Sequence, residues 1–322
     1  MKPTWLTVCV VAAVAFLPLT HAKPDEPGKA PTPVANPLLG KESGEVRDDN
    51  GLKMKLAWCP PGIFRMENYE VITEPAVEKE NQPNDDDEAD RKDEPEPRQT
   101  EKITSVKVFL TKGYWIGKYE VTQSEWKQLM NTEPWKNQNF TKEGANFPAT
   151  YINWDDAMQF CRKLTEQERR AGRLPTGWEY TLPTEAQWER ACRARTETIF
   201  SFGDDESKLG EYGWFRDNTS DANEQFSHRV GQKKANPWGL HDMHGNVGEW
   251  CRDVYAAKLP GGRDPEVKAD EKTKGSDRVF RCGGWEDDAA SCQSGSRCWV
   301  GPDYRYYCIG FRLALSSVQP VK

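Results

Sequence analysis

Glycine, proline and tryptophan are spread so densely along this chain that long regular elements have little room in it. The sequence contains 25 Gly, 22 Pro and 13 Trp, and after Arg195 it consists of turns, short strands and aromatic residues. Gly and Pro terminate regular elements, whereas Trp needs a packed interior. No repeat of fixed period is present. We therefore predict an α+β fold with more irregular backbone than average, in one large domain or two small ones.

The N-terminus carries an export signal. An apolar run from Trp5 to Leu19 follows Lys2 and ends in small residues at Ala22, the pattern of a secretory signal peptide over residues 1–22. A Pro-rich linker over 23–45 follows. The protein is therefore expected to be exported, periplasmic or secreted, the alternative being an uncleaved N-terminal membrane anchor. No second apolar stretch is long enough to span a membrane, so no integral membrane domain is expected beyond the signal.

The negative charge of the chain comes from one segment. Residues 67–98 contain 13 acidic and 4 basic side chains, whereas the whole chain has a net charge of −7. Such a segment buries little apolar surface, so we predict an acidic disordered insertion at about 67–98. The remainder of the chain is close to neutral and has no block of Lys and Arg, which excludes a nucleic-acid partner.

Patterns of neighbouring residues predict strands and helices in the part of the chain before Arg195. Alternating or apolar runs predict strands at 52–58, 105–110 and 114–117. Three helices are predicted from their start signals. Thr122 with Glu125 starts a helix to Met130, Asn153 starts one ending near Gly172, and Thr184 with Gln187 starts the third.

The cysteines and histidines form no standard metal or nucleotide motif. Eight cysteines remain after Cys9 is removed with the signal, and an even number in an exported protein permits disulfides. None forms a Cys-x-x-Cys pair, which argues against structural zinc. His241 and His244 lie three apart, a spacing better explained by packing or loop hydrogen bonds than by a metal. The sequence also lacks a phosphate-binding Gly loop and a Gly-x-Ser-x-Gly elbow.

Five segments, taken in order, carry a resemblance to a known family. They are 113–122 (GYWIGKYEVT), 182–189 (LPTEAQWE), 236–250 (NPWGLHDMHGNVGEW), 278–285 (RVFRCGGW) and 309–313 (IGFRL). Together they resemble the formylglycine-generating enzyme (sulfatase-modifying factor) family between about Leu52 and Leu315. The resemblance implies one compact α+β domain at 46–318, a variant of the C-type lectin fold with little regular secondary structure.

The resemblance also implies a chemistry whose residues are incomplete here. Active members oxidise a cysteine in a Cys-x-Pro-x-Arg segment of a sulfatase to formylglycine, using oxygen and a copper(I) ion held by two thiolates, ligands that suit that ion. Counted from Gly283-Gly284, the two copper positions hold Asp288 and Gln293. Copper by the usual two-cysteine route is therefore not expected. Cys292, one place before the second position, and Cys298, at a third, structural position, remain the catalytic candidates.

Two structural features of the family also map onto this chain. The resemblance implies a disulfide between Cys192 and Cys298. It further implies a structural calcium ion bound through a tight loop, with oxygen ligands that suit a hard cation. The matching ligands are the side chains of Asp242 and Glu249 and the carbonyls of Gly245 and Val247.

These observations favour an exported family member that is a non-catalytic binding or assembly domain. Its expected partner is a protein or peptide, such as a sulfatase-like segment, or a surface polysaccharide. Two enzymatic alternatives stay open. One is an oxidoreductase of the same family with another substrate, and the other is formylglycine generation at a rebuilt Cys292/Cys298 site.

Overall fold

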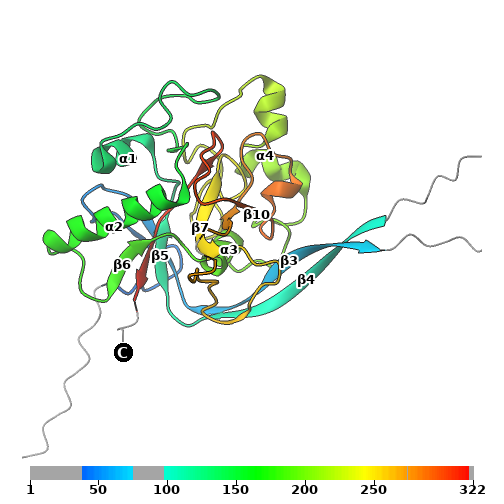
Figure 1. Cartoon of the computed structure of the whole chain (residues 1–322), viewed down its shortest axis with the longest axis horizontal. Helices are drawn as coiled ribbons and strands as arrows, with labels where there is room; N and C mark the ends of the chain where they lie inside the picture. Colours follow the sequence, from blue (N-terminus) through cyan, green and yellow to red (C-terminus); the bar gives the residue numbers. More distant parts are fainter. Residues whose placement is uncertain (1–37, 75–97, 274, 319–322) are drawn as a thin grey trace, which may run out of the picture. The chain divides into compact units, whose positions relative to one another are not determined.

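The computed structural model describes residues 38–74, 98–273 and 275–318 (Figure 1). The predicted signal peptide and most of the predicted linker lie outside the described residues. The strands are β1 (Val46–Arg47), β2 (Leu56–Cys59), β3 (Gly62–Glu74), β4 (Arg98–Leu110), β5 (Tyr114–Gly117), β6 (Trp178–Thr181), β7 (Gly248–Val254), β8 (Gly262–Arg263), β9 (Arg278–Arg281), β10 (Arg297–Val300), β11 (Ile309–Gly310) and β12 (Ala314–Ser317). The helices are α1 (Gln123–Met130), α2 (Trp154–Arg170), α3 (Glu185–Arg193) and α4 (Leu209–Tyr212), with short 3-10 turns at Glu206–Lys208, Arg216–Asn218, Ser220–Ala222 and Ala290–Cys292.

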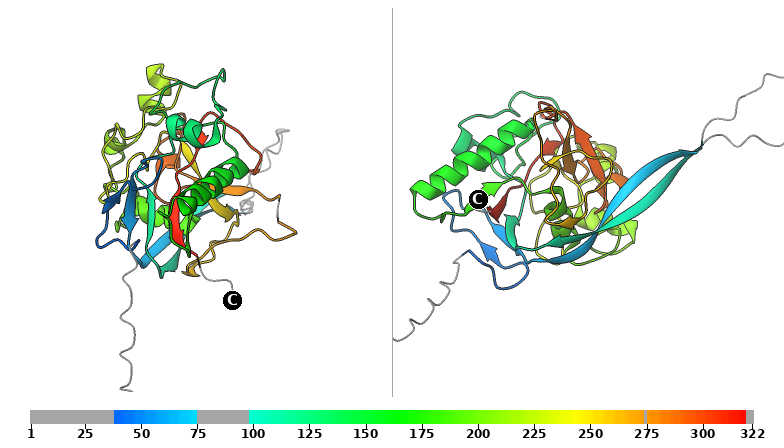
Figure 2. Two further views of the ribbon diagram at one scale, coloured as in Figure 1. Left: turned by 90° about the vertical axis from the view of Figure 1, so that its left-hand side faces the viewer. Right: turned by 60° about the horizontal axis from the view of Figure 1, so that its bottom comes forward.

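The described strands form three sheets, with strand orders β1-β2-β5-β12-β6, β10-β9-β7-β11 and β3-β4-β8. Most neighbours are antiparallel, whereas β11 lies parallel to β7 and β8 lies parallel to β4. Strand β12 pairs with both β5 and β6, so the end of the domain returns to the interior of the first sheet. Figure 2 shows α2 along the outside of the domain, where it packs against β6 and α1.

The three predicted helices are confirmed, together with their start signals. Thr122 and Thr184 each form a capping box with the side chain three residues later, and the Asn153 side chain accepts from the backbone N–H of Asp156. These contacts span only a few residues, so the sequence specifies them locally.

One predicted strand and the bounds of the predicted acidic insertion need correction. The strand predicted at 52–58 is β2 alone, because Lys53 has a φ of +58° and turns the chain before Leu56. The acidic insertion is narrower than predicted, since β3 continues to Glu74 and pairs there with Arg98 of β4. The β-branched and aromatic residues of 69–73 favour a strand, which the charge pattern concealed. The rest of the predicted insertion, 75–97, lies outside the described residues.

Helix α3 occupies the centre of the domain, packed against β3, β7 and β9. Its buried Glu189 binds Arg281 of β9 and also Arg193 at 2.8 Å. Glu185 binds Arg297 at 2.5 Å. Because buried charges are stable only when paired, this network specifies how the helix sits on the sheet.

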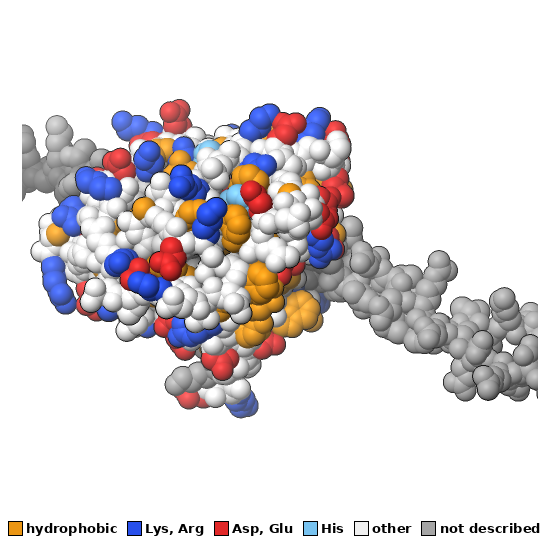
Figure 3. All heavy atoms as spheres, turned by 90° about the horizontal axis from the view of Figure 1, so that it is seen from above, with side chains coloured by type: hydrophobic (Ala, Val, Ile, Leu, Met, Phe, Trp, Pro, Cys, Tyr) orange, Lys and Arg blue, Asp and Glu red, His pale blue; other side chains and the backbone are white. Residues whose placement is uncertain are grey.

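The surface of the domain is mixed. On the face in Figure 3, positive and negative side chains are interspersed, and hydrophobic side chains reach the surface between them. None of the helices in the described ranges has both the length and the apolar character needed to span a bilayer.

Candidate functional site

Two loops of the second sheet bring a carboxylate, a thiol and several aromatic rings together. The loop after β9 supplies Trp285 and Glu286, and the loop before β11 supplies Tyr306, Tyr307 and Cys308. We call these five residues the Glu286 cluster. The Tyr307 hydroxyl donates to Glu286 Oε2, and the Cys308 thiol donates to Glu286 Oε1 at 3.2 Å. The Tyr306 hydroxyl donates to that of Tyr307 at 2.8 Å, so one carboxylate organises the whole cluster.

Aromatic rings gather around Tyr307, which donates to this carboxylate. Tyr307 lies 4.0 Å from Tyr306, 4.9 Å from Phe140 and 5.5 Å from Trp285, measured between ring centroids. Phe140 is 44% exposed and Tyr304 is 41% exposed. The site therefore combines a carboxylate with neighbouring aromatic rings, two of them exposed, and both kinds of group attract cations.

Close backbone contacts hold the two loops in place. A Cβ on Gly284 would lie 2.8 Å from the Cβ of Cys308, so only glycine allows this approach. The backbone N–H of Trp285 donates to the Asn246 carbonyl, and that of Gly248 donates to the Cys308 carbonyl at 2.7 Å. The cluster is thereby attached to β7 and its preceding loop.

The electrostatics of the cluster keep its thiol protonated. Burial raises the pKa of Cys308 well above its ordinary value, and the negative charges of Glu286 and Asp287 raise it further. Burial and the hydrogen bond to Glu286 also raise the pKa of Tyr307. Because the thiolate is the nucleophile and the metal ligand, Cys308 at neutral pH is a hydrogen-bond donor rather than a reactive group.

The two catalytic candidates from the sequence both lie within the electrostatic influence of Asp287, the residue after Glu286. Cys292 ends the 3-10 turn Ala290–Cys292 and is fully buried, and a Cβ on Gly283 would lie 2.8 Å from its sulfur. Burial, followed by the charges of Asp287 and Asp288, raises its pKa well above the ordinary value. Cys298 lies half-buried on β10, where burial raises its pKa to about 11. Both are thiols at neutral pH.

The disulfide implied by the resemblance is not formed in the structure, where Cys192 and Cys298 are both free. The Cys192 thiol donates to the Met243 carbonyl at 3.5 Å and lies 3.8 Å from His244 Nε2. It thus faces the loop before β7. Burial raises its pKa to about 12.

Of the four predicted calcium ligands, Glu249 already has protein partners for both of its oxygens. Arg312 binds Glu249 Oε1 through Nη2 at 2.5 Å and Oε2 through Nε at 2.6 Å. Trp188 Nε1 donates to Oε2 at 2.6 Å. The Gly245 carbonyl accepts a contact from the Cys282 thiol at 3.5 Å. With both Glu249 oxygens bound and a guanidinium beside them, this carboxylate already has its counterion.

Asp242 lies beside a second buried acid, Glu120, which the sequence did not indicate. Its Oδ1 is buried without a hydrogen bond, and so is Oε2 of Glu120. Burial raises the pKa of Asp242 to about 6, and burial together with the charge of Asp242 raises that of Glu120. Glu120 stands between Tyr119 and Val121, and a lone acid among apolar residues was the available signal. Across the described residues, no three His, Cys, Asp or Glu side chains converge as metal ligands do.

We predict that His244 makes stability fall in weak acid. Its Nε2 accepts from the Ser201 N–H at 3.1 Å, so Nδ1 carries the proton and donates to the Cys292 carbonyl at 3.0 Å. Burial lowers its pKa from 6.5 to about 4. Between these values the unfolded chain binds a proton that the folded chain does not. Stability is therefore lost as the pH falls through this window, by up to about 3 kcal/mol.

Urea unfolding between pH 7 and 4.5 measures this loss. His244→Gln should flatten the pH profile relative to the unmodified protein, because Gln has no proton to gain. Parallel profiles for the two proteins would show that His244 does not contribute.

Known proteins share both the sequence and the fold of this domain. A sequence model of the sulfatase-modifying factor enzyme 1-like domain matches residues 55–317. Chaperone protein LppX of Paenibacillus barcinonensis is 26% identical over 210 residues, 53% of this chain and 69% of that protein. Formylglycine-generating enzyme of Mus musculus is 27% identical over 181 residues, 53% of this chain and 44% of the enzyme. The match thus spans less than half of the mouse protein.

Two solved structures have the same fold. PvdO from Pseudomonas aeruginosa has a TM-score of 0.63 at 23% identity, with 86% of this chain and 99% of that one covered. Treponema denticola variable protein 1 has a TM-score of 0.59 at 25% identity, with 81% and 94% covered.

Proposed function

This chain belongs to the sulfatase-modifying factor family, and on that premise we propose that it is an exported binding domain rather than a generator of formylglycine. The resemblance predicted from the motifs and the single α+β domain are both confirmed. We place the binding surface at the Glu286 cluster. Its partner is a protein or peptide segment that presents a cationic side chain, such as the arginine of a sulfatase-like segment.

The observation that carries this proposal is the residue type at the two copper positions, where Asp288 and Gln293 stand in place of cysteines. Cys292 and Cys308 have a pKa raised by burial and by neighbouring carboxylates, and the pKa of Cys298 is also raised. A pair of thiolates is what copper(I) requires. At the copper positions counted from Gly283-Gly284, Asp288 caps its own turn by accepting from the Ser291 N–H at 3.0 Å. Asp288 therefore supports local structure at this position.

The Glu286 cluster, by contrast, is suited to binding. Each Glu286 oxygen accepts one hydrogen bond within the protein and retains acceptor capacity for a ligand. Phe140 and Tyr304 offer exposed rings on the same face. A guanidinium can bind such a carboxylate while it stacks on a ring. Chaperone protein LppX, whose name is not that of a formylglycine-generating enzyme, is similar to this chain over 210 residues.

The enzymatic alternative is a rebuilt site at Cys292 and Cys298. The two thiols lie close enough for the charge of Cys298 to raise the pKa of Cys292, which is the observation in its favour. An oxidoreductase with another substrate would use the same pair.

A peptide assay separates these alternatives. The purified chain is incubated with copper(I), oxygen, a thiol reductant and a Cys-x-Pro-x-Arg peptide, and mass spectrometry follows the peptide thiol. We expect no aldehyde. Aldehyde formation that is lost in Cys292→Ala but retained in Cys251→Ala, a buried cysteine on β7, would overturn the non-catalytic role.

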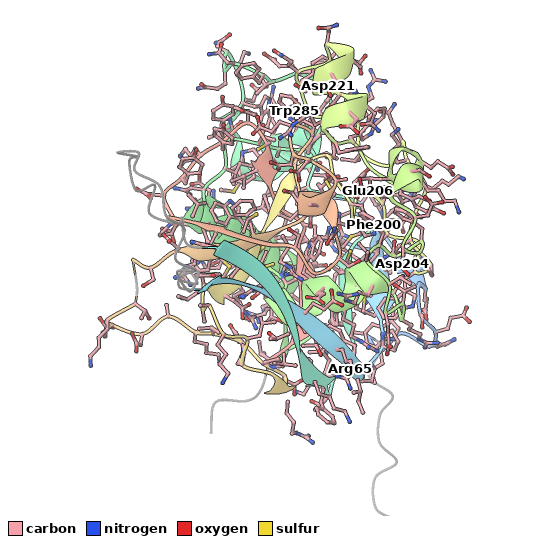
Figure 4. All side chains as sticks on the ribbon, turned by 90° about the vertical axis from the view of Figure 1, so that its right-hand side faces the viewer. Arg65, Phe200, Asp204, Glu206, Asp221 and Trp285 are labelled. Atoms are coloured by element: carbon pink, nitrogen blue, oxygen red, sulfur yellow. The ribbon has the colours of Figure 1, made fainter. Side chains whose placement is uncertain are left out.

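The same peptide tests binding. Its affinity for the chain, measured by fluorescence anisotropy, should fall about tenfold in Glu286→Gln, because a charge-assisted hydrogen bond is lost. The matched control is Glu206→Gln, an exposed acid that lies away from Trp285 in Figure 4. Equal affinities in both variants would rule out the Glu286 cluster as the binding surface.

A further inference from the structure

A separate cleft of about 350 Å³ lies beside the first residues of β3, and its lining is strongly positive. It is formed in part by Arg65, Arg190, Arg193 and Arg195, with Glu197 as its one acidic residue. We infer that this arginine cleft binds a tetrahedral oxyanion, a sulfate or phosphate ester, carried by a saccharide-sized group.

Protein carboxylates neutralise only part of this charge. Arg193 pairs with Glu189 and with Glu67, each at 2.8 Å. Arg65 instead donates to the Ser105 hydroxyl at 3.2 Å, and Arg195 donates to the Ser43 hydroxyl at 3.0 Å. Within the described part of the chain, the ion pairs leave Arg65, Arg190 and Arg195 without a carboxylate partner. Three guanidiniums therefore share one cleft without an ion-pair partner among the described residues.

Of the three arginines, Arg190 gives the strongest indication of an anion site, because its side chain is buried. Among the described residues, its guanidinium donates to neutral carbonyls alone, those of Pro60 and Pro61 at 3.2 Å and that of Ile63 at 3.4 Å. Burial lowers its pKa, and the positive charge of Arg195 lowers it further. A buried cation with these neighbours is stabilised by an anion.

A purely structural role explains only some of these residues. Arg190 and Arg193 lie in the last turn of α3, where cations interact favourably with the helix dipole. Arg65 comes from β3 and Arg195 from the turn that follows α3. In that turn Ala194 and Arg195 both have a left-handed backbone, with φ of +47° and +80°, and Arg195 reaches the cleft from there. Neither Arg65 nor Arg195 is needed to cap the helix.

The apolar edge of the cleft indicates what carries the anion. Ile63 is 57% exposed, and Phe64 lies under the Arg190 guanidinium at 5.9 Å. The volume is within the range of small-ligand sites. A sugar ring has C–H faces that pack on such side chains, while its ester group binds the guanidinium forks. The cleft therefore favours an organic ester over the free ion.

This site does not depend on the Glu286 cluster. Figure 4 places Arg65 on the β3–β4 ribbon, at the opposite end of the view from Trp285. A failure of either proposal consequently leaves the other in force.

Calorimetry with defined sugars tests the inference. The full chain is titrated at low salt with glucose 6-sulfate, glucose 6-phosphate and glucose. At least one ester should bind and glucose should not. Arg65→Gln/Arg195→Gln should weaken binding of that ester about tenfold or more, since each substitution removes a charge-assisted bond. Both arginines are exposed, so the core stays intact.

The control is Arg162→Gln, an exposed arginine on α2. Binding of the sulfate ester alone or the phosphate ester alone supports the inference and identifies the source of the anion. Three results would overturn it: neither ester binds, the double variant binds as well as the unmodified chain, or Arg162→Gln weakens binding equally. The last result would mean that net charge alone attracts the ester.

Discussion

Arg312→Met should destabilise the domain by about 3–5 kcal/mol, because it leaves a buried carboxylate without its counterion. Arg312 and Glu249 are both fully buried and are joined by two hydrogen bonds of 2.5 and 2.6 Å. The Arg312 guanidinium also donates to the Gly117 and His241 carbonyls. Replacing Arg312 therefore removes hydrogen bonds that join three segments of the chain, in addition to a charge.

Urea unfolding followed by tryptophan fluorescence measures this cost. The double variant Arg312→Met/Glu249→Gln should recover part of the loss, since it no longer buries an unpaired charge. The matched control is Arg305→Met, which breaks the partly exposed pair with Asp156 and should cost no more than about 1 kcal/mol. Equal losses for Arg312→Met and Arg305→Met would refute the argument from burial.

Gly245→Ala is expected to cost about 3–5 kcal/mol, the second large effect. Gly245 has a φ of +141°, and a Cβ there would lie 2.3 Å from the Trp214 carbonyl oxygen. Backbone strain and overpacking each cost about 1–3 kcal/mol, and a backbone atom cannot move aside like the end of a side chain.

Gly239→Ala separates these two costs. Gly239 has a φ of +75° with nothing within 4 Å of an added Cβ, so it reports strain alone, at about 1 kcal/mol. Thermal unfolding of the two variants in parallel gives the comparison. If Gly245→Ala and Gly239→Ala have the same melting temperature, the close approach of residue 245 to Trp214 does not affect stability.

Local signals explain why much of the fold could be predicted from the sequence. The capping boxes at Thr122 and Thr184 are complete within four residues, and the structure has both. The start of β4, in contrast, depends on pairing with β3. The charge pattern does not report this pairing, so the strand was predicted to begin too late. The start of a helix is determined by residues close together in the sequence, whereas the end of a strand depends on the strand that pairs with it.

The candidate site was harder to predict because its contacts join distant residues. Counting from Gly283-Gly284 led to Cys292 and Cys298, yet Cys308 is the cysteine that bonds Glu286. Likewise, Glu249 was expected to bind calcium, but it binds Arg312, 63 residues further along the chain. Residue type suggests such roles, but only tertiary packing decides which partner each side chain meets.

The far end of the paired β3–β4 ribbon is a suitable place to insert foreign sequence into this domain. Each strand has 13 residues, and Glu74 and Arg98 are register partners at the far end. Because Glu74 and Arg98 are already paired, a flexible insert between them would cost only about 0.6 kcal/mol more in loop-closure entropy for each doubling of its length. An epitope tag or a second folded module could be inserted there while the core remains as it is.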